Sequence, residues 1–317
     1  MIEINETNFP DANFRQYLLS QNYGKDGVLT DESIKEITKI EVRWMDISSL
    51  KGIEYFTSLK ELNCYTNILK DLDVSKNTEL ICLDCTANEL TTLDISKNIK
   101  LQKLVCDGND LVALDVSNNT ELIELDCGAT KITSLNVSNN VKLTRLVCSY
   151  SRLTDLNVSG NTALTYLNCT YNQLTTLDLA NCTKLTKLEC QSNRLTTLNV
   201  SGCLLLEKLS CRCNQLATLD VSGCTSLIIL LCSHNRINEV SMNALIASLP
   251  QTSGEIYIYD YSVYDVSDEV YCEDEKIYEG NICTNEHIAA IKAKDWIPYV
   301  MYANKYFWTE CEYGALS

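Results

Sequence analysis

The chain has 317 residues, of which 45% are hydrophobic and 8% aromatic, so it is long and apolar enough to bury a continuous core. A formal net charge of −16 argues against a basic surface for nucleic acid or for an anionic membrane. No apolar run reaches the roughly 18 residues of a membrane-spanning helix, so we expect neither a nucleic-acid partner nor membrane insertion.

The first 38 residues predict a helical N-terminal cap. A helix capped by Asn8 or Asp11 is expected first, and a second helix over residues 31–37. The connecting residues 22–30 resemble an EF-hand calcium loop, with Gly27 at the turn position. Because this loop carries too few carboxylates to bind calcium, we interpret it as structural and expect no metal.

The central part of the chain is repetitive. Its unit reads L-x-x-L-x-C-x-x-N-x-L-x-x-L-D-V-S-x-N-T-x, and its cysteines recur every 21 residues at Cys64, Cys85, Cys106, Cys127, Cys148, Cys169, Cys190, Cys211 and Cys232. A fixed period of this size indicates a solenoid, in which each repeat buries its apolar edge by stacking on its neighbours. We therefore predict an α/β, β-rich, right-handed leucine-rich repeat arc of about ten 21-residue coils over residues 39–240.

Each coil is expected to begin with a short parallel strand. Alternation points Leu62 and Cys64 inward and leaves Asn63 and Tyr65 outside. The second half, L-x-x-L-x-V, predicts another strand-like side. Stacked inward asparagines predict a ladder that satisfies backbone groups, formed by Asn67, Asn88, Asn109, Asn172, Asn193, Asn214 and Asn235. Thr130 and Ser151 interrupt this ladder, so we expect weaker stacking there.

The 17 cysteines are explained mainly by this period. Cys182, Cys203 and Cys224 form a second 21-residue series, at the position that Asn77 holds in an earlier coil. Parallel strands lie about 4.8 Å apart, farther than the roughly 3.8 Å between the Cβ atoms of a disulfide, so both series are predicted to be buried thiols. Cys272, Cys283 and Cys311 lie outside both series, and a Cys272–Cys283 bridge stays an open alternative.

The last 77 residues, 241–317, predict an acidic, tyrosine-rich α/β cap. We expect a helix over 242–249, a strand over 254–260, a long loop over 261–282, a helix over 285–294 and a strand over 296–302.

The repeats resemble those of a known family. The pattern I-x-x-I-x-V from Ile37, followed by I-S-S-L-K-G-I-E-Y-F-T-S-L, is similar to bacterial internalins, and the 21-residue repeats resemble their cysteine-ladder subgroup. The segments G-E-I-Y-I-Y-D and A-I-K-A-K-D-W resemble closing caps of secreted leucine-rich repeat proteins of gut bacteria. The resemblance implies a secreted or cell-surface protein whose signal peptide is absent from this sequence; a cytosolic location is the alternative.

Little in the sequence indicates catalysis. The chain has two histidines, His234 and His287, and Cys82-x-x-Cys85 places its thiols on opposite strand faces. The column that contains Asp73 predicts turns rather than a cation site. We expect no enzyme activity and no cofactor, although a catalytic site in residues 255–317 remains a third hypothesis.

The outward face of the strands is the predicted binding surface, because concave solenoid faces bind partners and exposed aromatic and Arg side chains dominate interfaces. The candidate residues are Tyr65, Val105, Arg145, Val147, Tyr150, Tyr166, Tyr171, Lys187, Lys208 and Arg212. The predicted function is a monomeric, non-enzymatic recognition or adhesion module for a protein or glycan. A cytosolic or translocated protein–protein adaptor is the alternative.

Overall fold

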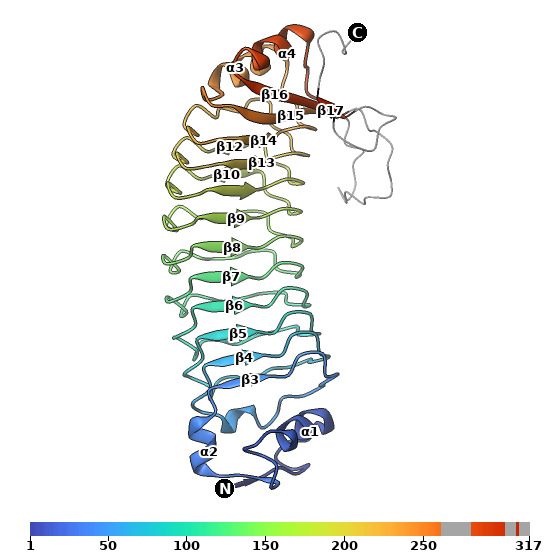
Figure 1. Ribbon diagram of the computed structural model, residues 1–317, viewed down its shortest axis with the longest axis vertical. Coiled ribbons are helices and arrows are strands. Elements are labelled where there is room, and N and C mark those ends of the chain that lie inside the picture. The colour runs from blue at the N-terminus through green and yellow to red at the C-terminus, as the bar shows by residue number, and fades with distance from the viewer. Residues whose placement is uncertain (261–279, 302–308, 311–317) are drawn as a thin grey trace. The chain divides into compact units, whose positions relative to one another are not determined.

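The computed structural model describes residues 1–260, 280–301 and 309–310 (Figure 1). It divides into two compact units, Met1–Arg152 and Leu153–Ser317. The predicted long loop falls largely on residues 261–279, which lie outside the described residues. Cys272 and Cys311 also lie outside the described residues.

The first unit opens with two capped helices. Helix α1 (Ala12–Ser20) is capped by Asp11, whose carboxylate accepts the N–H of Phe14 at 2.9 Å, and helix α2 (Asp31–Glu36) is capped by Thr30. Strands β1 (Ile2–Glu3) and β2 (Val28–Leu29) pair antiparallel beside them. Of the two predicted caps, Asp11 is the one that forms.

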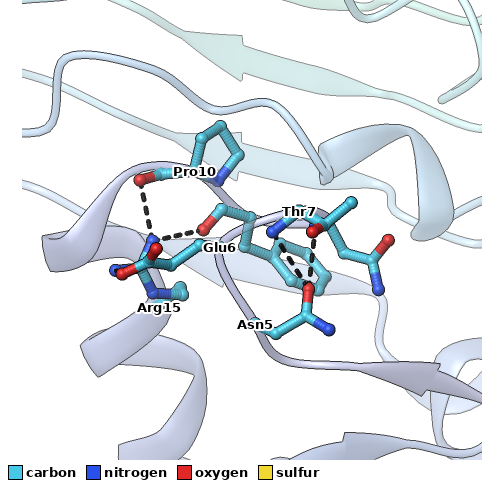
Figure 2. A network of polar contacts seen from close by, with 7 residues as sticks. Asn5, Glu6, Thr7, Pro10 and Arg15 are labelled. Atoms are coloured by element: carbon cyan, nitrogen blue, oxygen red, sulfur yellow. Dashed lines mark hydrogen bonds and ion pairs between the residues drawn. The ribbon is translucent and has the colours of Figure 1, made fainter.

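A local network fixes the segment that leads into α1 (Figure 2). The Arg15 guanidinium donates to the carbonyl of Pro10 at 2.7 Å and pairs with Glu6, while the Asn5 side chain accepts the N–H of Thr7. The backbone ahead of α1 is therefore held by side chains from both of its ends.

The helical segment is bonded to the first coil. Besides capping α1, the Asp11 carboxylate accepts the N–H and the hydroxyl of Ser48, each at 2.8 Å. The Phe9 ring packs edge-on against Tyr55. Gly52, with φ 104°, lies so close that a Cβ there would come within 2.2 Å of the Phe9 ring, so this contact requires glycine.

The coils of the first unit form a parallel sheet in strict register. Each strand contributes three residues and places its central leucine or isoleucine against the next, as Leu62 lies against Leu83. The strands are β3 (Lys39–Glu41), β4 (Glu61–Asn63), β5 (Cys82–Asp84), β6 (Lys103–Val105), β7 (Glu124–Asp126) and β8 (Arg145–Val147). A 3₁₀ turn, η1 (Ile53–Tyr55), closes the first coil.

The second unit repeats this arrangement and ends in mixed α/β structure. Its parallel strands are β9 (Tyr166–Asn168), β11 (Lys187–Glu189), β13 (Lys208–Ser210), β14 (Ile229–Leu231), β15 (Gly254–Asp260) and β16 (Trp296–Met301), and β17 (Thr309–Glu310) pairs antiparallel with β16. Helices α3 (Glu239–Ser248) and α4 (Asn285–Lys292) lie where helices were predicted, and β15 has the predicted bounds.

The second half of the coil was predicted to be strand-like in every repeat, and this prediction is wrong for most coils. In the described residues it forms strands only at β10 (Thr176–Asp178) and β12 (Thr197–Asn199), which pair parallel. Elsewhere this side consists of turns around inward residues such as Leu72 and Val74. Because 21 residues must close a full turn, few are left for a second strand.

The asparagine ladder forms as predicted. Asn88 is typical: its amide donates to the carbonyls of Cys64 and Cys85 at 3.1 and 3.0 Å, and its oxygen accepts the N–H of Leu69 at 3.1 Å. Asn281 continues the ladder from the C-terminal cap by donating to the carbonyl of Cys232. This last rung lies outside the 21-residue period, so the spacing gave no signal for it.

The ladder cysteines line the interior. All nine are fully buried, and Cys64, Cys85, Cys106, Cys127, Cys169, Cys190 and Cys211 are free thiols. Burial raises the pKa of the Cys169 thiol to about 12, so these sulfurs are neutral packing groups. Cys182, Cys203 and Cys224 are equally buried.

The residue two positions after each ladder cysteine has a left-handed backbone. The series is Thr66, Ala87, Gly108, Ala129, Tyr150, Tyr171, Ser192, Cys213 and His234, with φ between 46° and 64°. Its N–H groups bond to the next coil, as Ala87 does to Asp107 at 2.9 Å. Because this bond is repeated along the stack, the coil imposes the conformation on residues that rarely adopt it.

Candidate binding face

We define the strand face of a unit as the outward side chains of its parallel strands together with the two residues that follow each ladder cysteine, or Val42 in the first coil. The sequence candidates divide between the two units. Tyr65, Val105, Arg145, Val147 and Tyr150 lie on the first, and Tyr166, Tyr171, Lys187, Lys208 and Arg212 on the second.

The candidates differ in how much surface they offer. Tyr150 is 56% exposed, and most of the others are half-buried. Val147 is only 7% exposed although it points outward, whereas Val105, at the same place in its strand, is half-exposed. The expectation that Val147 presents apolar surface is therefore corrected.

Three basic side chains on the first strand face, Lys39, Lys103 and Arg145, form ion pairs with glutamates. Lys103 and Arg145 both pair with Glu124, at 2.9 and 3.3 Å. Lys39 pairs with Glu41 and Glu61, and the hydrogen bonds to these carboxylates raise the pKa of the Lys39 ammonium. Except for Lys39 with Glu41, which lie in one strand, these ion pairs link neighbouring coils.

Three aspartates on the same face have neutral hydrogen-bond partners. Asp84 accepts the Asn63 amide at 3.4 Å, Asp107 accepts the Thr86 hydroxyl at 2.9 Å, and Asp126 accepts the N–H of Gly128 at 3.2 Å. Burial, reinforced by the nearby Asp107 carboxylate, raises the pKa of Asp126 to about 6. Asp126 therefore holds its proton more readily than an exposed aspartate does.

An aromatic pair marks the start of this face. Trp44 is 68% exposed and meets Tyr65 edge-on, with ring centroids 5.1 Å apart and planes at 86°. Sequence reasoning missed Trp44. Its signal was its place two residues after Val42, the same place in the coil that Tyr150 occupies.

The second strand face carries a compact tyrosine–lysine–glutamate cluster. Lys187 lies 5.0 Å from the centre of the Tyr166 ring and pairs with Glu189 at 2.7 Å, while the Tyr166 hydroxyl donates to Glu189. Although burial acts to raise it, the hydrogen bonds from Lys187 and Tyr166 leave the pKa of Glu189 lowered. The cluster is therefore charged and ordered.

Two further tyrosines extend the second strand face onto β15 and β16. The rings of Tyr257 and Tyr299 stack with centroids 4.8 Å apart and planes 12° from parallel. Tyr257 donates to Glu255 at 2.9 Å, and burial together with this bond raises the pKa of Tyr257 to about 12. The alternation in G-E-I-Y-I-Y-D was the signal that could have placed Tyr257 here.

The residues considered for catalysis have structural positions. Cys82 is half-exposed on the strand face and Cys85 is fully buried, as predicted for opposite faces. His234 occupies a left-handed turn, and His287 belongs to the capping box of α4. Within residues 1–260, 280–301 and 309–310, no group of three or more His, Cys, Asp or Glu side chains is arranged to hold a metal ion.

Across the part of the chain that the structure describes, none of the helices is long and apolar enough to span a lipid bilayer.

Known proteins share this fold. The functional domain of InlJ from Listeria monocytogenes, whose structure includes a cysteine ladder, aligns with a TM-score of 0.72 and 32% identity over 84% of this chain. The chain is a leucine-rich repeat protein of the cysteine-ladder type. This leucine-rich repeat protein covers 58% of that InlJ chain, less than two thirds of its length.

Other similar structures show the fold alone. The internalin InlF of Listeria monocytogenes aligns with a TM-score of 0.67 and 21% identity, over 96% of this protein and 92% of that chain. The Leptospira interrogans protein LIC12759 aligns with a TM-score of 0.68 and 23% identity, over 88% of this protein and 70% of that chain. No protein-family model matches the leucine-rich repeat protein, and no curated protein matches it.

Proposed function

We propose that this protein is a non-enzymatic recognition module that binds a protein or glycan through its strand faces. The observation that carries the proposal is the difference between the inward and outward positions of each coil. Inward positions repeat leucine, cysteine and asparagine, whereas outward positions present aromatic and charged side chains such as Trp44, Tyr65 and Tyr166. Exposed aromatic and basic residues on a rigid scaffold are typical of binding surfaces.

The chemistry of the described residues supports binding rather than catalysis. Several acidic and basic side chains of the strand faces are held in ion pairs, between neighbouring coils as for Lys103 with Glu124, or within one strand as for Lys187 with Glu189. Such pairs fix the direction in which each side chain points, so the face is organised in advance of binding.

The test is a capture experiment with the whole chain immobilised and strand-face variants in parallel. We expect Tyr65→Ala and Arg145→Ala on the first unit, or Tyr166→Ala and Lys208→Ala on the second, to reduce retention of the captured partner at least tenfold. Lys100→Ala, which removes an exposed ion pair with Glu79 away from the strand face, is the matched control. Equal retention by all variants would contradict binding through this face.

We propose that the protein is secreted or displayed on a bacterial surface, with a translocated or cytosolic adaptor as the second candidate. The buried thiols suit both locations, because burial raises the pKa of the Cys190 and Cys211 thiols and keeps them from solvent. Fractionation of the source cells, followed by immunoblotting of medium, envelope and cytosol, distinguishes the two locations.

A further inference from the structure

A strip on the first strand face lies between two exposed aromatic positions. The Trp44–Tyr65 pair stands at one end and Tyr150 at the other. Backbone bonds join the coils between them in register, as from Ala87 to Asp107 and from Ala129 to Ser149. Four strand spacings of about 4.8 Å give roughly 19 Å between the ends, the span of about six residues of extended peptide.

The side chains along the middle of this strip are small. They are Ala87, Gly108, Gly128 and Ala129. Gly128 is packed under the next coil: a Cβ there would lie 3.0 Å from the Ser149 carbonyl oxygen. The strip therefore combines a low centre with bulky aromatic ends, which suits a ligand that lies flat and anchors itself at each end.

The charge of the strip selects the kind of ligand. Asp84, Asp107 and Asp126 border it with neutral hydrogen-bond partners, whereas the bases Lys103 and Arg145 are engaged by Glu124. Burial contributes most to the raised pKa of Asp126, and repulsion from the Asp107 and Glu124 carboxylates adds to it, while Arg145 acts against it. A cation placed at the strip relieves this repulsion, but the hydroxyl of a neutral glycan does not.

We propose that this strip binds an extended peptide segment that carries Arg or Lys at alternate positions, with apolar residues that pack on the Trp44–Tyr65 pair and on Tyr150. Alternation follows from the ligand's extended backbone, which turns every second side chain toward the strip. A guanidinium can bond both oxygens of a carboxylate, and an indole face also attracts it. This inference rests on the proposed function and names the partner class for the first unit.

The probe is an array of heptapeptides with Arg or Lys at positions 3 and 5 and Leu or Phe at positions 1 and 7, so that all four side chains face the strip when the peptide is extended. A matched array replaces each basic residue by citrulline, which keeps the shape of arginine without its charge. The best peptide is then measured by fluorescence anisotropy with the whole chain. We expect citrulline to weaken binding more than tenfold, and 500 mM salt to weaken it similarly relative to 50 mM.

Variants locate the site. Asp107→Asn and Asp126→Asn are each expected to weaken peptide binding about tenfold, and so is Trp44→Ala, with Tyr150→Ala as a second aromatic variant. Asp71→Asn changes the net charge equally at an exposed position away from the strip, and should change the affinity less than twofold. Circular dichroism melts confirm that each variant is folded.

Three results would overturn the inference. They are no heptapeptide bound more tightly than about 1 mM, an equal loss in Asp71→Asn and Asp107→Asn, or a neutral glycan whose binding needs Trp44 while the basic peptides fail. If the captured partner still depends on strand-face residues in these cases, the proposed function stands and only the peptide assignment falls. If capture is also insensitive to them, both fall.

Discussion

At the scale of single residues, Asp126 links the strand face to stability. Its pKa in the folded chain is about 6, against an ordinary value of 3.8, chiefly because burial disfavours the charged carboxylate. The folded state therefore holds a proton more readily than the unfolded state does. This contribution to stability is fully present below about pH 4 and is lost as the pH rises through about 6.

Asp126→Asn is accordingly expected to stabilise the protein at neutral pH. An asparagine oxygen can still accept the N–H of Gly128, but it carries no charge. After allowance for solvent screening of this half-buried group, we expect a gain of about 1–2 kcal/mol in the free energy of unfolding at pH 7.5. Little gain should appear at pH 4. Urea titrations at both pH values measure it, and an equal gain at pH 4 and pH 7.5 would contradict this explanation.

Some of these residue roles were predictable and others were not. The inward direction of Cys85 and the outward direction of Cys82 follow from strand alternation alone. The left-handed backbone at Ala87 does not follow from its residue type, because bonding to the next coil overrides an unfavourable preference. Residue type and strand alternation do not predict the burial of Val147, because Val105 has the same residue type and the same strand position and is half-exposed.

At the scale of the elements, two stacked series of inward asparagines, one containing Asn88 and the other Asn98, form different hydrogen bonds. In the first, Asn88 both donates to carbonyls and accepts the N–H of Leu69. In the second, Asn98 donates to the carbonyls of Val74 and Asn77, and its own oxygen is buried without a hydrogen-bond partner. Later coils replace this asparagine by cysteine, and the Cys203 thiol bonds to the carbonyl of Leu179 at 3.4 Å.

This difference predicts unequal effects of the same substitution. Asn98→Cys keeps one donor to the carbonyl of the preceding coil and removes a buried unsatisfied oxygen, so we expect a loss of at most about 1 kcal/mol. Asn88→Cys leaves the N–H of Leu69 without its acceptor, and should cost about 2–3 kcal/mol. Guanidinium unfolding of the two variants measures the difference. Equal costs would show that both ladders act only by filling space.

The 21-residue repeat made the first strand of each coil predictable, whereas the second side of the coil and the residues beyond the repeat were harder to predict. Period 21 places every first strand from β4 to β14, because each coil reuses one pattern of inward residues. The second side was predicted as strand from similar alternation, yet in the described residues it is strand only at β10 and β12. Asn281 supplies a rung from outside the period, so only the folded chain reveals it.

At the scale of the whole molecule, a solenoid is as stable as its stacked interfaces, because each coil contacts only its neighbours. The interruption of the asparagine ladder at Thr130 and Ser151 is therefore expected to weaken the interfaces between the coils around it. Thr130 donates to the carbonyl of Cys127 and meets the Ser151 hydroxyl at 3.1 Å. A hydroxyl is shorter than a carboxamide and carries one donor in place of two.

We predict that the coils around this interruption open more readily than those before it. In the uninterrupted coils Asn109 accepts the N–H of Leu90, and the corresponding amides beside the interruption are those of Leu111 and Ile132. Hydrogen exchange at these two amides should be about tenfold faster than at Leu90, equivalent to about 1.4 kcal/mol in local opening.

Restoring the ladder tests the cause. The double variant Thr130→Asn, Ser151→Asn should slow exchange at Leu111 and Ile132 to the rate at Leu90, because each new carboxamide can reach the neighbouring coil as Asn109 does. Thr120→Asn adds the same group at an exposed position and should leave these rates unchanged. If exchange at Leu111 and Ile132 already matches Leu90 in the natural sequence, the hydroxyl pair stacks as well as asparagine does. The coils would then unfold as one cooperative block, without a weak interface at residues 130–151.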